Sequence, residues 1–383
     1  MHFLELNDWR LRAWDPAGTL LCEQTAAASC ANGELCFGDA ALAHSHSHPQ
    51  QFNHRYLGSL SADPLPAPLG SAHNHADLTY HNLRQLALPA TPVGVCVSGS
   101  LSNQQLGLFL GICQEVGLQV CGFLDTALVH SLAVPAHADF HVLEIEMHRT
   151  TLSHVAVTPG QRNRVHTATF DGTGVAAIVD GWMNVIADQF VQKTRFDPLH
   201  TGQTEQTLFD QVRGWLRDVS ISDQHVRVSQ ATAVREIEVS AQLLREKFAQ
   251  RLGSIELDHV EHLILGPQAA KLPGLRTWVA ERVKRVDSCN DADLAANCRQ
   301  LAEAFVAGDI RRVTSAAVAT SVDEPSALPP QPLEPPPQAT HLLHEFCAYA
   351  LSDPRFGGAD VGEPIVGTQL RIDDALYTAI RIE

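Results

Sequence analysis

Apolar and polar positions alternate through the opening segment of the chain, and tight turns separate the apolar runs. These runs lie at 3–6, 11–14, 19–25 and 34–38. Asp15-Pro16-Ala17-Gly18 suits a tight reversal, since proline takes its second position and glycine its fourth. A second reversal is expected at Asn32-Gly33. Because a period of two is typical of half-buried strands, the chain is predicted to begin with a β-meander.

The same alternation returns near residue 140. It predicts strands over 140–146, 152–157 and 164–170, with a turn over 158–163. The two halves of the chain therefore open in the same way.

Each half also contains a short apolar strand that ends in small residues. Val93 to Val97 leads into Ser98-Gly99-Ser100, and Val260 to Leu265 leads into Gly266. After the first comes a helical pattern over 106–116, a strand over 118–124 and a helix from Thr126. Strand, helix and strand at this spacing predict a right-handed crossover in a parallel sheet. We therefore expect an α/β protein with duplicated lobes, 1–138 and 139–318, and a cleft between them.

The later part of the second half has a helical pattern, and the composition changes after it. Trp182, Phe209, Trp215 and Phe248 have helical spacing and are expected in the core, and 291–306 is expected to be a closing helix. Prolines then crowd into 319–338, which predicts a stiff linker. The tail, 339–383, offers a short helix over 342–351 and a β-like ending over 369–382. It is expected to be too small for an independent domain.

Composition narrows the class of protein. The chain has 383 residues, 45% of them hydrophobic, and a formal net charge of −16. This charge opposes nucleic acid and anionic membrane surfaces as partners. Charged residues interrupt the first 21 positions, and polar ones interrupt the apolar stretch 106–124, so neither a secretory signal nor a membrane span is expected. The nine cysteines include no C-x-x-C pair and are expected to be reduced and buried. These features predict a cytoplasmic protein.

Several segments, taken in order, resemble a known family. They are Gly33–Ala41 with its Gly-Asp-Ala-Ala, Arg55-Tyr56-Leu57-Gly58, the strand, helix and strand over 93–120, Thr126-Ala127, the strand and loop over 260–273, and the helix over 290–307. In order they resemble the nucleotide-binding domain of the seventy-kilodalton heat-shock protein family, within the actin-like ATPase superfamily. The resemblance implies a two-lobed actin-like fold with duplicated ribonuclease H-like lobes and a nucleotide cleft.

The nucleotide-binding motifs that the resemblance implies are eroded. Where the family has Asp-Leu-Gly-Thr-Thr and Asp-Leu-Gly-Gly-Gly-Thr, this chain has 5–9 (Glu-Leu-Asn-Asp-Trp) and 144–149 (Glu-Ile-Glu-Met-His-Arg). Phosphate loops need glycine so that backbone amides can approach the anion. The family's catalytic lysine falls on His54, its glutamate before Pro-Thr-Ala falls on Leu124, and only Gly266 remains of its adenosine loop.

Charge repulsion at these eroded loops opposes a bound phosphate. A carboxylate such as Glu146 at about 4 Å from a phosphate charge costs roughly 4 kcal/mol at an effective dielectric near 20. Micromolar binding is worth only about 8 kcal/mol. We therefore expect no catalytic residue and no bound cofactor.

A vestigial nucleotide cleft is the candidate site. By the resemblance it consists of Asn7, Asp8, Thr126, Arg149 and Gly266. Arg149 is the main route by which a phosphate could still be held. Trp9 could fill the space that a phosphate takes in active relatives and so lock the lobes together.

Three clusters have competing interpretations. Glu5, Asp8, Glu144 and Glu146 would either form an acidic site for a metal or cationic ligand, or be strand-end charges that are solvated or paired with Arg149; we favour the second interpretation. His44, His46, His48, His54, His73, His75 and His81 would be a metal site or, as we favour, exposed loops, because their spacing matches no closed zinc site. Ser98-Gly99-Ser100 would be a nucleophile turn or, as we favour, strand-end packing. No metal is expected.

The expected function is that of a heat-shock-protein-like pseudo-ATPase, which acts as a protein-interaction scaffold or regulator. Only 46 residues, 338–383, follow the last proline of the linker, so a peptide-binding domain is not expected. A protein partner is expected at the tail, by strand addition or by a short helix in a groove. One alternative is a divergent ATPase that holds ATP or ADP with magnesium through Arg149, Gly266 and Thr126. Another is a small-molecule kinase of the same fold.

Overall fold

The structure is a computed structural model, and it describes two stretches of the chain. These are residues 1–318, except 32, 90, 136, 137, 219, 231 and 232, and residues 338–381, except 345, 346, 357–360, 363, 365 and 374. The chain divides into two compact units, Met1–Thr320 and Ser321–Glu383. Apart from Gln338, the expected linker over 319–338 lies outside the described residues.

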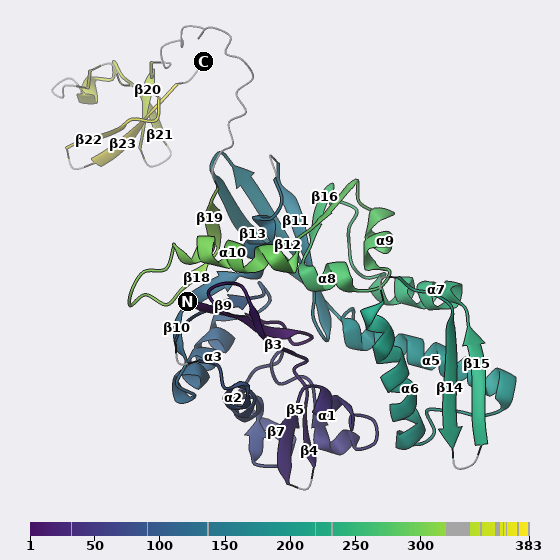
Figure 1. Ribbon diagram of the computed structural model, residues 1–383. Coiled ribbons are helices and arrows are strands. Elements are labelled where there is room, and N and C mark those ends of the chain that lie inside the picture. Colours follow the sequence, from purple (N-terminus) through teal and green to yellow (C-terminus); the bar gives the residue numbers. More distant parts are fainter. Residues whose placement is uncertain are drawn as a thin grey trace. The chain divides into compact units, whose positions relative to one another are not determined.

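The first unit is mixed α/β and contains two six-stranded sheets (Figure 1). The first sheet has the order β18-β10-β9-β1-β2-β3. Its strands are β1 (His2–Leu6), β2 (Leu11–Trp14), β3 (Leu20–Gln24), β9 (Pro92–Val97), β10 (Gln119–Asp125) and β18 (Arg312–Val313). β1, β9 and β10 are parallel, while β2 and β3 follow β1 in antiparallel pairing. The predicted first meander and crossover are confirmed.

The second sheet repeats this arrangement, with the order β17-β16-β11-β12-β13-β19. Its strands are β11 (Phe140–Ile145), β12 (Arg149–Thr158), β13 (Gln161–Asp171), β16 (His262–Leu265), β17 (Arg285–Ser288) and β19 (Ser315–Ala317). β11, β16 and β17 are parallel, and β11, β12 and β13 form the antiparallel meander. The predicted second meander is confirmed, and its second and third strands are longer than expected.

Residues 312–317 join both sheets. β18 runs parallel to β10 at the edge of the first sheet, and β19 runs antiparallel to β13 at the edge of the second. The expected division of the chain at residue 138 is therefore incomplete, because part of the expected second lobe completes the first sheet.

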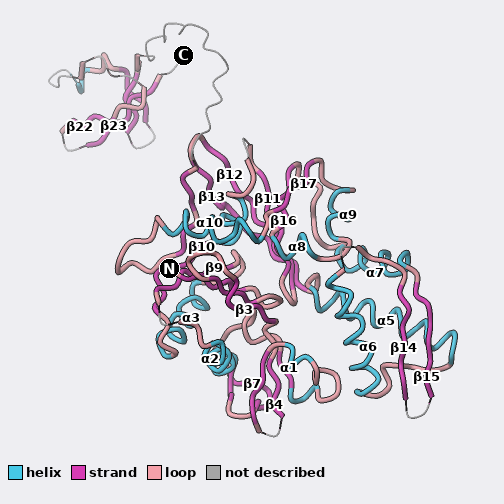
Figure 2. The backbone as a smooth tube through the Cα atoms, in the orientation of Figure 1, coloured by secondary structure: helices cyan, strands magenta, loops and turns pink. Residues whose placement is uncertain are grey.

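Helices pack on both sheets (Figure 2). Those of the first half and the closing segment are α1 (Asp39–Leu42), α2 (His75–Leu86), α3 (Asn103–Glu115), α4 (Thr126–Ser131) and α10 (Asp291–Ala302). Those of the second half are α5 (Val175–Thr194), α6 (Gly202–Gly214), α7 (Ala241–Leu252), α8 (Pro267–Lys271) and α9 (Leu275–Ala280). Three short 3-10 helices occur elsewhere along the described chain: η1 (Pro49–Gln51), η2 (Trp215–Arg217) and η3 (Pro354–Phe356). The closing helix ends at Ala302 and not at 306, because Val306 bridges to Asp309 in a tight turn.

Small antiparallel sheets extend from each half. They are β4 (Ala28–Ala31) with β5 (Glu34–Phe37) and β6 (Phe52–Asn53), β7 (Pro64–Leu69) with β8 (Ala72–Asn74), and β14 (Gln224–Gln230) with β15 (Ala233–Val239). Gly33 has a φ of 83° at the predicted reversal, whose Asn32 lies outside the described residues.

The prediction that all seven clustered histidines lie in exposed loops is wrong for His73, His75 and His81. His75 and His81 belong to α2, and His73 lies in β8. The helix begins here because the Asn74 side chain accepts a hydrogen bond from the Asp77 amide, a typical N-cap.

The aromatic residues expected in the core are divided. Trp182 and Phe248 are buried and stack at 6.3 Å between ring centroids. Phe209 and Trp215 are only partly buried and pack against the edge of the cluster. The prediction of core positions is confirmed for Trp182 and Phe248, whereas Phe209 and Trp215 are less buried than predicted.

The second unit is a four-stranded antiparallel sheet with the order β21-β20-β23-β22. The strands are β20 (His341–His344), β21 (Cys347–Ala350), β22 (Gln369–Ile372) and β23 (Ala375–Ile380). The predicted helix over 342–351 is wrong, because Leu342 pairs with Ala379 across strands and both are buried in a separate cluster with Phe356. The β-like ending is confirmed. The tail also has its own sheet and hydrophobic cluster, contrary to the expectation from its size.

Two other expectations concern the whole chain. Among the described residues, no helix is both long and apolar enough to cross a membrane. Eight cysteines are free thiols; Cys96, Cys113, Cys289 and Cys298 are buried, and Cys22, Cys30, Cys36 and Cys121 are partly buried. The side chain of Cys347 lies outside the described part.

Candidate functional site

The loops that follow β1 and β11 meet in the interior of the first unit. β1 ends at Leu6, and the Asn7 side chain turns the chain by accepting hydrogen bonds from the amides of Trp9 at 3.0 Å and Arg10 at 3.4 Å. Asparagine favours such turns because its short side chain can hydrogen-bond to amides two and three residues ahead. This turn directs residues 7–9 toward the second sheet.

Asn7 and Asp8 bind the opposite loop directly. The Asn7 amide Nδ2 donates to the Ile145 carbonyl at 2.9 Å, and the Met147 amide donates to Asp8 Oδ1 at 2.6 Å. Both side chains are buried. The loops thus satisfy each other's polar groups across the junction of the two halves.

Arg149 is also occupied by protein groups. Its Nε donates to Glu146 Oε2 at 2.5 Å, and its Nη2 donates to the Gly58 carbonyl at 3.1 Å. Gly58 is close to Asp8 as well, because a Cβ at this position would lie 2.5 Å from Asp8 Oδ2. The guanidinium through which a phosphate could still have been held instead joins loop 144–149 to the segment at Gly58.

The amino end of α5 makes contacts of the same kind. The Val175 amide donates to the Glu146 carbonyl at 3.1 Å, and the Ala176 amide donates to the Met147 carbonyl at 2.9 Å. A Cβ on Gly174 would clash with the backbone of residues 147–149. Free amides at a helix N-terminus attract anions, but the loop carbonyls occupy these two.

Thr126 and Gly266 lie deeper in the structure than the other predicted residues. The Thr126 hydroxyl donates to the Val97 carbonyl at 3.3 Å, and the Gly266 amide donates to the Leu143 carbonyl at 2.9 Å. The His130 ring lies 3.0 Å from where a Gly266 Cβ would be. The structure therefore brings Asn7, Asp8 and Arg149 together and buries Thr126 and Gly266 apart from any open surface.

The four acidic residues are buried, so the expectation that they are solvated is wrong. Glu146 pairs with Arg149 as expected, but Glu5 pairs with the buried Arg12 at 2.7 Å. Carboxylates rarely enter a protein interior without such partners.

Burial also changes the protonation of this region. Burial, together with the nearby Glu146, raises the pKa of Asp8 to about 7, while the Met147 amide and Arg149 act in the opposite direction. Burial likewise raises the pKa of Glu144 well above its ordinary value. It lowers the pKa of the adjacent His130 to about 3. Burial thus favours the uncharged form of both groups, and His130 Nδ1 lies 3.5 Å from Glu144 Oε1.

Trp9 packs into the hydrophobic cluster of the second half. It is 4% exposed and shares this cluster with Met147, Val175 and Val179. A residue that follows the first strand thus fills space beside the second sheet. That it takes the place of a phosphate stays a prediction.

Neither the histidines nor the serine turn forms a recognisable reactive site. Among the described residues, no group of three or more His, Cys, Asp and Glu side chains could hold a metal ion. The Ser100 hydroxyl donates to Ser98 Oγ at 3.1 Å and to Glu146 Oε1 at 3.3 Å. His54 lies against His148, with ring centroids 4.5 Å apart, and burial lowers its pKa to about 3.

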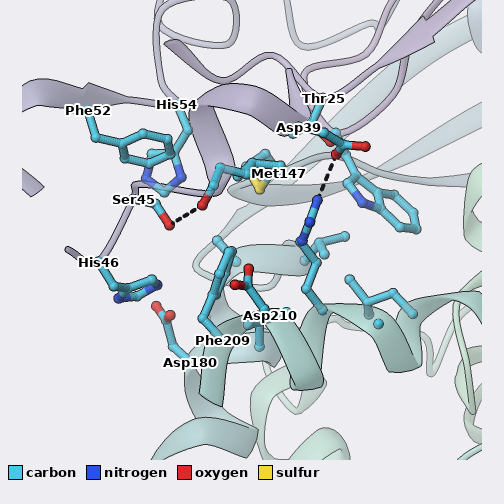
Figure 3. A pocket seen from close by; sticks show the side chains of 18 of the residues that line it. Thr25, Asp39, Ser45, His46, Phe52, His54, Met147, Asp180, Phe209 and Asp210 are labelled. Carbon is cyan, nitrogen blue, oxygen red and sulfur yellow. Dashed lines mark hydrogen bonds and ion pairs between the residues drawn. The ribbon is translucent and has the colours of Figure 1, made fainter. Parts of the chain in front are cut away.

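A cavity of about 560 Å³ lies beside this junction (Figure 3). Residues 39–55 form one wall, α5, α6 and η2 form the other, and Trp9 and Met147 lie between them. None of the five predicted site residues lines it. Sequence reasoning missed this cavity because its walls come from distant segments with no motif; the one local signal was Phe52, an aromatic residue within a polar, histidine-rich stretch.

Comparison with known proteins adds no family assignment. No protein-family model matches the chain, and a search of curated proteins finds no significant match.

Proposed function

We propose that this chain is an actin-like pseudo-ATPase that serves as a protein-interaction scaffold. The observation that carries the proposal is the direct bonding between loops 5–9 and 144–149. Asp8 accepts from the Met147 amide and Asn7 donates to the Ile145 carbonyl, where a phosphate-binding protein would leave amides free. A nucleotide could enter only if these bonds broke.

The sheet topology supports the actin-like part of the proposal. In each sheet, the three meander strands can be numbered 1 to 3 and the two later parallel strands 4 and 5, in chain order. Both sheets then have the spatial order 3-2-1-4-5. A duplicated order of this kind is what two ribonuclease H-like lobes would give. It agrees with the resemblance of the sequence to the heat-shock ATPase domain.

The buried charges support the absence of nucleotide. The junction contains Asp8, Glu144 and Glu146, and the guanidinium of Arg149 beside them is bonded to Glu146. A triphosphate placed there would meet carboxyl groups rather than donors. An ionised carboxylate close to a phosphate costs roughly 4 kcal/mol, which is about half of the binding free energy of a micromolar ATP site.

A titration with fluorescent ATP and magnesium tests this proposal. We expect no saturable binding up to about 100 μM and no phosphate release above the rate without protein. Submicromolar binding would contradict the pseudo-ATPase. Turnover that is lost in Arg149→Ala, in a variant shown by circular dichroism to be folded, would instead establish the divergent ATPase.

The small-molecule kinase is a weaker alternative. Such a kinase needs a catalytic aspartate facing the transferred phosphate, whereas Asp8 is already bound to the Met147 amide and Asp125 forms an ion pair with Arg164 at 2.7 Å. We therefore retain the scaffold as the proposed function.

The second unit supports a partner site. In the described part, β21 and β22 each pair on one side only, so each leaves an edge to which another strand could add. Leu343 and Leu376 are exposed on neighbouring strands, 37% and 54% respectively. We propose a protein partner that adds a strand here, in place of the helix-in-groove alternative.

Pull-down with the full chain and with a chain ending at residue 318 tests the partner site. We expect the shorter chain to lose the partners that the full chain retains. Equal recovery by both chains would exclude the second unit as the tether.

A further inference from the structure

The cavity beside the junction has one end that combines carboxylates with aromatic rings. Asp180 from α5 and Asp210 from α6 lie near Phe209, and the His46 ring lies beside them (Figure 3). His46 packs on Phe209 with ring centroids 4.6 Å apart, and its Nδ1 contacts Glu205 Oε1 at 3.0 Å. This end therefore offers negative charge and aromatic faces together.

The two carboxylates are incompletely paired. Asp210 accepts from Gln206 Nε2 at 3.1 Å, within its own helix, and the Asp180 carboxylate has no hydrogen bond or ion pair to any described residue. The nearest lining arginine on the same helix, Arg213, is bonded to Asp39 at 2.7 Å. The protein thus leaves negative charge at this end without a bonded cation.

Arginines also line the cavity. Arg10 pairs with Glu23 at 2.9 Å, whereas Arg55 and Arg217 are exposed and have no acidic partner among the described residues. An anion at Arg55 and Arg217 is the competing interpretation. The rings of His46 and Phe209 lie beside Asp180 and Asp210, however, and aromatic faces attract cations.

We propose that this cavity binds an organic cation with an extended aliphatic body, such as an alkylammonium. Asp180 and Asp210 would hold the ammonium group, and the rings of Phe52 and Phe209 would face it. Leu42, Val179 and Leu216 would cover its methylene groups. The volume of about 560 Å³ suits such a ligand. This cation site goes beyond the scaffold role and does not depend on it.

The surroundings of Asp180 agree with a missing cation. Its side chain reaches solvent at the mouth of the cavity, yet the protein atoms packed around the carboxyl raise its pKa above the ordinary value, while His46 and Arg251 oppose this shift. A carboxylate that is partly shielded from water gains more from an ammonium partner than a fully hydrated one does. The net charge of −16 would also favour the approach of cations.

Calorimetric titration of the full chain with spermidine and with an amidated tri-lysine peptide tests the proposal. We expect one site per chain for at least one of these probes. Binding of spermidine alone identifies a free amine as the ligand class, and binding of the peptide identifies a lysine side chain presented by a partner. Absence of saturable binding by both probes at low salt would overturn the proposal.

Variants at the carboxylates locate the site. Asp180→Asn and Asp210→Asn are each expected to weaken binding about tenfold or more, because a charged hydrogen-bond partner is lost. Asp188→Asn removes an equal charge from the exposed face of the same helix and should change affinity less than about twofold. Equal weakening by all three variants would mean diffuse attraction to an acidic surface and would overturn the site.

The competing anion site has its own control. Arg217→Gln should leave affinity for the cationic probe unchanged or raise it. If inorganic phosphate binds instead, and Arg217→Gln abolishes that binding while neither cationic probe binds, the cavity is an anion site and the proposal is wrong.

Discussion

Asp8 combines two roles that normally conflict in a carboxyl group. Its Oδ1 accepts from the Met147 amide, which fixes the loop, and its burial makes the ionised form unfavourable. The pKa is about 7 in the folded protein and 3.8 for an ordinary aspartate. Between these values the folded protein therefore holds one more proton than the unfolded chain. By linkage, the free energy of unfolding falls as the pH rises through this interval.

Asp8→Asn tests this linkage. The amide oxygen can still accept from Met147, and the residue can no longer ionise, so the variant should be more stable than the natural protein at pH 8 by about 1–4 kcal/mol. Near pH 4 the difference should vanish. Urea unfolding at both pH values measures it, with the exposed Asp63→Asn as the control. A variant that is less stable at pH 8 would show that the charge itself is needed.

Gly58 is predicted to be intolerant of substitution. In Gly58→Ala the new Cβ would lie 2.5 Å from Asp8 Oδ2, and Asp8 cannot move without losing its bond to Met147. We expect a loss of about 1–3 kcal/mol in urea unfolding. Gly107→Ala is the matched control, because nothing lies within 4 Å of a Cβ there and alanine favours its helix. That variant should be unchanged or slightly more stable, and equal losses in both would contradict the packing argument.

At the residue scale, the sequence indicated the chemistry of the junction but not its solvent exposure. The acidic loops and the pairing of Arg149 with Glu146 could be proposed from motif positions alone. Burial of Glu5 could not. Its partner Arg12 lies opposite it on β2, but the pair is covered by Asp291 only when α10 docks. The amide-to-carboxyl bond between Met147 and Asp8 joins positions 139 residues apart and leaves no local signal.

The two loops and the start of α5 behave as one element of structure. Trp9 packs against Met147 and Val175, and the first amides of α5 are bonded to the carbonyls of residues 146 and 147. Trp9 also lines two separate cavities. Its indole therefore lines both cavities and also holds the loop in the hydrophobic cluster.

Trp9→Ala should weaken this element strongly. Loss of a buried indole costs about 3–5 kcal/mol, and it would open the wall between the two cavities. Trp9→Phe should cost clearly less, since an aromatic ring remains. Urea unfolding compares the two variants, and binding of the fluorescent ATP probe after Trp9→Ala would show whether the indole excludes nucleotide. A loss below about 1 kcal/mol for alanine would mean that the ring is not an anchor.

At the element scale, the sequence predicted regular elements well where their periodicity was long. Both meanders follow from a period of two over several strands, and α3 follows from its apolar face and its Ser102–Gln105 capping box. The tail was misread because apolar residues at 342, 343 and 351 fit a short helix as well as a hairpin. The segment becomes a strand because it pairs with residues 378–380, which lie far along the chain.

The whole chain combines two units that have separate sheets and separate hydrophobic clusters. We expect the chain ending at residue 318 to unfold at the same temperature as the main transition of the full chain, within about 2 °C. Scanning calorimetry measures both, and circular dichroism of the shorter chain provides the control for folding. A main transition lowered by more than about 5 °C would mean that the second unit stabilises the first.

The position of residues 312–317 has a consequence for how the first unit forms during synthesis. β18 and β19 come from the last segment of this unit, and each closes an edge of a different sheet. Until the ribosome has added residues 312–317, β10 and β13 each have an edge with unpaired backbone N–H and C=O groups. Such edges can pair with strands of other nascent chains. A chain stalled before residue 312 would thus expose two strand edges that promote aggregation, and translation of residues 312–317 would cover both.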